Sequence, residues 1–240
     1  MNDSVLRIRL VCGLLASAAR LVPVPFLDDF LREKAGHVLV SQTLQAHGRT
    51  YRSKEVAPLY TDSMGCLHGC LLGAVTGVFK LITYPVKKFV VYVMAAKWLA
   101  RDLAEAVLLG RAMDRALSAG QLRDDGDKAA RHMEADRLRK AFDNAVAGTD
   151  MKLLRTVIDG TVVSIGGLPR AAFAALKGLR RQDADAVTDP SEGLSAANEA
   201  KVAEGTDRLA AALDTEDMRA FLQAFDQRLD ENLRILSARG

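Results

Sequence analysis

The chain has 240 residues, a length that allows one large domain or two small ones. Hydrophobic residues make up 49% of it but aromatic residues only 5%, and this composition, dominated by alanine, leucine and valine, favours helices over strands. The three cysteines lie in apolar surroundings, which excludes a disulfide framework and indicates a reducing compartment. We therefore predict an all-α protein: a helical bundle with glycine-rich, proline-broken apolar hairpins and a C-terminal amphipathic helix.

The formal net charge of +3 conceals an uneven distribution of charge. Acidic residues concentrate in residues 182–207, so the part of the chain before them is strongly basic. A basic body indicates an anionic partner, either a lipid or a nucleic acid. Because the bases lie within apolar segments rather than in polar, aromatic-rich loops, an anionic membrane lipid is the expected partner and nucleic acid is unlikely.

The N-terminal residues 5–22 are apolar with interspersed arginines. They fit either a cleaved signal peptide or an amphipathic helix that lies on a membrane or on the protein itself. Pro23 and Pro25 end this segment, and a second helix is predicted over 26–47 with Gly48 as its C-cap. The polar residues 49–62 are predicted to form a loop or a short helix.

The stretch 63–101 is the most apolar part of the chain, and it holds five basic residues and no acidic one. A glycine recurs at every fourth position in its first half, which places all four glycines near one helix face. Such a face allows a close helix–helix contact, either between membrane helices or in a soluble helix crossing. The predicted helix-packing residues are Gly65, Gly69, Gly73 and Gly77.

This stretch is poorly suited to a single membrane span. The charge-free run 63–79 is shorter than the roughly 20 residues that a spanning helix needs, and Tyr84-Pro85 is expected to break or kink the path of the chain, so that two short helices meet at Pro85. A re-entrant hairpin, a helix in the plane of the membrane and a buried core hairpin all remain open. The predicted membrane-contact residues are Lys80, Lys87, Lys88, Lys97, Trp98 and Arg101.

Amphipathic periodicity continues after residue 101, and it predicts one helix that ends near Gly120 and another over 129–146. The acidic turn between them lacks the ligand spacing of a calcium loop. Residues 151–181 form a second apolar, basic stretch that glycines and Pro169 interrupt. This stretch resembles 63–101 in design but does not align with it as a repeat.

The predicted organisation is a basic helical membrane-associating body at 1–181, an acidic flexible linker at 182–205 and a C-terminal amphipathic helix at 206–240. The last helix carries an apolar stripe along one face. The stripe serves either to dock the helix on its own domain or to bind a partner, including a second copy through a coiled coil. Its residues are Leu222, Phe225, Leu229, Leu233 and Leu236.

No motif for catalysis, a cofactor or a metal is recognisable. Cys66 and Cys70 share a helix face, but His68 lies nearly opposite them, and no phosphate loop or nucleophile elbow is present. The sequence therefore predicts a non-catalytic, membrane-associated scaffold or adaptor at an anionic membrane surface on the cytoplasmic side. The alternatives are a soluble helical bundle that binds an apolar ligand or a protein partner, and an enzyme whose site the sequence does not reveal.

Overall fold

The computed structural model describes residues 3–19, 27–61, 84–122, 127–164 and 195–238. Every regular element in these ranges is helical, which confirms the all-α prediction. The first glycine-rich half of the central stretch lies outside the described residues. The elements are α1 (Asp3–Ala19), α2 (Leu27–Ala46), α3 (Ser53–Val56), η1 (Ala57–Leu59), α5 (Tyr84–Ser118), α6 (Lys128–Ala147), α7 (Lys152–Ser164), α9 (Ala196–Leu213) and α10 (Glu216–Ser237).

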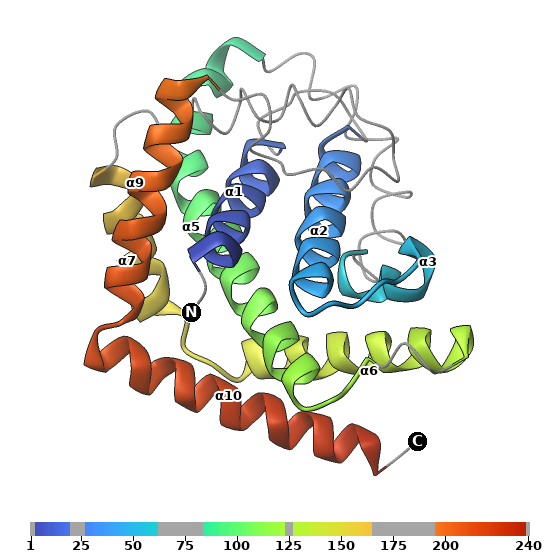
Figure 1. Cartoon of the computed structure of the whole chain (residues 1–240). Helices are drawn as coiled ribbons and strands as arrows, with labels where there is room; N and C mark the ends of the chain where they lie inside the picture. Colours follow the sequence, from blue (N-terminus) through green and yellow to red (C-terminus); the bar gives the residue numbers. More distant parts are fainter. Residues whose placement is uncertain (1–2, 20–26, 62–83, 123–126, 165–194, 239–240) are drawn as a thin grey trace.

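Helix α1 is the centre of the bundle and packs against α2, α5 and α9 (Figure 1). Leu6, Leu10 and Leu14 are almost completely buried, and burial extends around most of the helix. From the arginines of this segment, we predict an amphipathic helix on a surface as one of the alternatives. The structure instead buries Arg9 completely and pairs it with Asp114 of α5, so that α1 becomes a core helix.

The same type of C-cap, with a glycine at positive φ, ends both α2 and α5. Gly48 and Gly120 adopt positive φ angles of 69° and 76°, which a residue without a Cβ reaches at little cost. The amide of Arg49 donates to the carbonyl of Leu44 (2.9 Å), and the amide of Gln121 donates to that of Ala116 (2.9 Å). These are Schellman motifs, and they confirm Gly48 as a helix C-cap and the predicted helix end near Gly120.

Helix α5 runs without interruption from Tyr84 to Ser118. Pro85 lies in its first turn, where a missing backbone N–H breaks no intrahelical hydrogen bond. The proline therefore marks the start of this helix. The basic apolar run that contains Lys87 and Lys97 and the amphipathic segment that follows Arg101 belong to one helix.

The C-terminal part is divided differently from the prediction. Residues 196–205, which we expected to belong to the flexible linker, are helical in α9, and Val202 and Thr206 are buried. Burial of this face against the bundle outweighs the acidic composition. The chain then breaks between α9 and α10, where Thr215 is the N-cap and Glu216 and Asp217 in the first turn complement the helix dipole.

The apolar stripe of α10 faces α6 of the same chain (Figure 1). The rings of Phe225 and Phe142 meet edge to face with centroids 6.2 Å apart. Leu222, Leu229 and Leu233 are buried with Phe225, and Leu236 is partly buried. Of the two predicted uses of the stripe, the structure therefore has the helix docked on its own domain, with these side chains inside the fold and not on a surface open to a partner.

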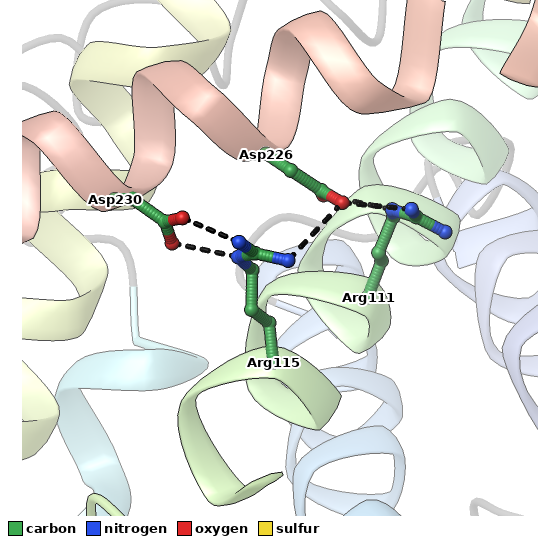
Figure 2. A network of polar contacts seen from close by, with 4 residues as sticks. All are labelled: Arg111, Arg115, Asp226 and Asp230. Atoms are coloured by element: carbon green, nitrogen blue, oxygen red, sulfur yellow. Dashed lines mark hydrogen bonds and ion pairs between the residues drawn. The ribbon is translucent and has the colours of Figure 1, made fainter. Parts of the chain in front are cut away.

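An ion-pair network joins the polar edge of α10 to α5 (Figure 2). Arg111 donates two hydrogen bonds of 2.8 Å to the carboxylate of Asp226, which is buried apart from 8% of its surface. Arg115 pairs with Asp230 and also lies 3.5 Å from Asp226. These contacts orient α10 on the bundle.

Candidate functional site

An open cavity lies at one end of the bundle. Its walls are the last turns of α2, the loop 47–52, α3 and the first turns of α6, and its volume is about 890 Å³. This size falls within the range of small-molecule sites in proteins. In Figure 1, α3 lies beside the end of α2, and the start of α6 lies next to α3.

Short-range contacts hold the walls of the cavity in place. The Tyr51 hydroxyl donates a hydrogen bond to the carbonyl of Leu122, and the guanidinium of Arg131 lies 5.6 Å from the centre of the Tyr51 ring. Nδ1 of His132 lies 3.2 Å from the carbonyl oxygen of Lys54, which links α6 to α3. Tyr51 of the loop thus contacts both the chain before α6 and α6 itself, and α6 also contacts α3. These contacts fix the position of the loop.

The inner wall contains a polar pair, His37 and Ser53. Nε2 of His37 lies 3.0 Å from the Ser53 hydroxyl, and the histidine is only 5% exposed. The ring of Tyr60 packs edge-on against His37 with centroids 5.0 Å apart, and its hydroxyl donates a hydrogen bond of 2.8 Å to the Ser53 carbonyl. These contacts hold the pair in place at the side of the cavity.

Positive charge dominates the described lining of the cavity. Glu55 is the single carboxylate among these lining residues, it is buried, and it lies 3.4 Å from Arg131. Its other oxygen accepts a hydrogen bond from the backbone amide of Arg52 at 3.3 Å. The basic residues of the lining are Arg49, Arg52, Lys54 and Lys128, accompanied by His37 and His132. This arrangement favours an anion in the cavity.

The predicted site residues fall in three places. Gly65, Gly69, Gly73, Gly77 and Lys80 lie outside the described residues. Lys87, Lys88, Lys97 and Trp98 lie on the helical backbone of α5, and Arg101 is exposed on the same helix. The stripe of α10 is internal, as described above. Of the predicted residues that the structure describes, none is among those that line the cavity.

Sequence reasoning missed the cavity because its parts are distant in the chain. His37, Ser53 and His132 come from three different helices, and each alone is an ordinary polar residue. The one available signal was the local density of basic residues in 49–54, which belong to the polar segment that we predicted to form a loop or a short helix.

Metal-binding clusters and membrane-spanning helices are both absent from the part of the chain that the structure describes. The described residues contain no group of three or more histidine, cysteine, aspartate or glutamate side chains placed to hold a metal ion. None of the helices that they form combines the length and the apolar character that crossing a membrane requires. Comparison with protein-family models, curated proteins and solved structures finds no match to this chain.

Proposed function

We propose that this chain is a non-catalytic helical adaptor that attaches to an anionic membrane surface on its cytoplasmic side. The contact is made by the stretch 63–101, and the helical body provides the attached domain. The observation that carries the proposal is the continuity of α5, which joins the basic, apolar end of this stretch to the core of the bundle.

The C-terminal part of α5 is firmly fixed in the body. Leu103, Leu108 and Met113 are completely buried, and this part of the bundle brings α1, α2 and α7 against the same helix. Because this part of α5 is fixed in the core, the position of the N-terminal end of α5 determines the position of the whole domain. An attachment near Tyr84 therefore fixes how the body is oriented on the surface, which is what an adaptor requires.

The composition of the stretch supplies the affinity. Each basic residue near an anionic leaflet contributes about 1 kcal/mol, and the neighbouring apolar residues add burial at the lipid boundary. Arg101 is exposed where the stretch meets the body, so it is available to such a surface. Because the attraction is partly electrostatic, salt weakens it.

The test is flotation of the purified protein with neutral and anionic vesicles at low and high salt. We expect binding to anionic vesicles that salt reduces, and we expect reversal of charge at Lys80, Lys87 and Lys88 to release the protein. Unchanged binding of this variant would count against electrostatic attachment.

A matched control reverses the same number of charges elsewhere. Arg219, Arg228 and Arg234 are exposed on α10, away from the proposed contact. Their reversal should leave vesicle binding nearly intact. If both triple variants detach equally, net charge alone explains the binding.

The alternative function is a soluble helical bundle that binds a small ligand or a protein. The open cavity at the end of α2 favours this alternative, because a space of about 890 Å³ can hold a ligand. Protein that remains at the bottom in every flotation condition, and that is monodisperse without detergent, would support the alternative and overturn the membrane proposal.

A further inference from the structure

We propose that the cavity formed by α2, the loop 47–52, α3 and α6 binds a phosphorylated small molecule. The phosphate group would lie against Lys54 and Lys128, and the organic part would lie against Leu44 and Met133. This inference is independent of the membrane proposal, since it uses different residues.

The charge of the described lining identifies the ligand as an anion. Lys54 and Lys128 are both exposed, and neither forms an ion pair with another described residue. The carboxylate of Glu55 is buried and bonded to Arg131, so it does not neutralise them. A phosphate ester carries close to two negative charges near neutral pH and offers three acceptor oxygens to such donors.

The size and the walls of the cavity require more than a bare ion. A volume of about 890 Å³ far exceeds that of an inorganic phosphate, so the cavity has room for an organic body beside the phosphate group. Met133 is a large apolar side chain with 58% of its surface exposed, and it lies at this cavity. The rigid pair of His37 and Ser53 adds a polar group that can orient such a ligand.

A phosphate group of this kind comes either from a soluble ester or from a phospholipid headgroup. In Figure 1, α5 begins at the end of the bundle where α2 starts, whereas α3 lies where α2 ends. The cavity is therefore at the opposite end of the bundle from the first turns of α5. This placement favours the soluble ester.

The test is a titration with phenyl phosphate followed by NMR of methyl-labelled methionines. Met133 should shift in a saturable way, whereas Met113 and Met218, which are completely buried, should not. Phenol at the same concentrations serves as the uncharged control and should produce no comparable shift. Failure of phenyl phosphate to move Met133, or an equal effect of phenol, would overturn the proposal.

Substitution of the two lysines tests whether they bind the phosphate group. Lys54→Gln with Lys128→Gln should weaken phenyl phosphate binding about tenfold or more, because charge-assisted hydrogen bonds are lost. The control, Lys140→Gln with Lys152→Gln, removes the same charge from exposed positions that do not line the cavity. Equal weakening by both variants would overturn the assignment of the phosphate contact.

Binding to vesicles that contain phosphatidic acid distinguishes a phospholipid headgroup from a soluble phosphate ester. If the Lys54 and Lys128 variant loses both phenyl phosphate and vesicle binding, the phosphate is that of a lipid headgroup. If it loses phenyl phosphate but still binds the vesicles, the ligand is a soluble ester. Both results support a phosphate-binding cavity, whereas retention of phenyl phosphate binding contradicts it.

Discussion

Gly110 of α5 lies directly beneath the side chain of Arg9 of α1. A Cβ placed on Gly110 would lie 2.1 Å from Nε and 2.7 Å from Cδ of this arginine. The missing side chain lets the guanidinium cross α5 and pair with Asp114, whose other oxygen lies 3.1 Å from Nε2 of His47. One glycine thus makes possible a contact that joins α1, α2 and α5.

We expect Gly110→Ala to lower the free energy of unfolding by about 1–3 kcal/mol, the usual cost of overpacking a tight contact. The cost rises further if Arg9 loses Asp114, because a buried charge without its partner is strongly destabilising. Urea denaturation of the variant and the wild-type protein measures the difference.

Gly160→Ala is the matched control for this substitution. No atom lies within 4 Å of a Cβ at Gly160, and the residue is inside α7. Alanine there should raise the free energy of unfolding by about 0.5–1 kcal/mol, because it is the better helix former. If the two substitutions change stability in the same direction, the contact between Arg9 and Gly110 is not as close as described.

The ion pairs between α5 and α10 should differ in strength according to burial. Asp226→Ala should cost about 1.5–3 kcal/mol, since it removes a bidentate contact from a buried carboxylate and leaves Arg111 without it. Asp230→Ala removes a similar contact with Arg115, but Asp230 is 47% exposed, so its loss should cost below about 1 kcal/mol. Thermal unfolding of both variants shows which substitution causes the larger loss of stability, and equal losses would contradict the expected difference.

The parts of the fold that could be predicted are those with a local signal. Gly48 ends α2 and Gly120 ends α5 because a glycine after an apolar periodic run is sufficient to specify the helix end. The position of Pro85 was correctly recognised as a boundary, but a proline in a first turn and a proline at a break look alike in one sequence.

Features that depend on distant partners could not be predicted. Arg9 made α1 look like a surface helix, because the sequence does not reveal that Asp114, 105 positions away, compensates the buried charge. The close glycine contacts described in the structure occur at Gly13, Gly36 and Gly110. None of them belongs to a regular glycine repeat, so spacing alone could not identify them.

The docking of α10 makes a separate prediction about self-association. Phe225→Ala should cost about 3–5 kcal/mol, because it leaves a cavity against Phe142 in the interface with α6. If the stripe served a coiled coil instead, the same change would dissociate an oligomer without destabilising the monomer. Analytical ultracentrifugation together with thermal unfolding separates these results, and we expect a loss of stability with no change in the mass of the native protein.

Partial burial of Asp159 in α7 predicts a pH-dependent stability. Desolvation raises the pKa of this carboxyl above its ordinary value of about 3.9, because burial disfavours the charged form. Between the ordinary pKa and the raised one, the folded state holds more protons than the unfolded state. The free energy of unfolding therefore falls as the pH rises through this interval, and the penalty persists at neutral pH.

Asp159→Asn removes this penalty, so it should raise the melting temperature at pH 7 and leave it nearly unchanged near pH 3, where the carboxyl is protonated in both states. Asp207→Asn, at an exposed position in α9, is the control and should have little effect at either pH. A gain for Asp159→Asn that is as large at pH 3 as at pH 7 would mean that the amide stabilises α7 by another route, since a desolvated charge has no effect once it is neutralised.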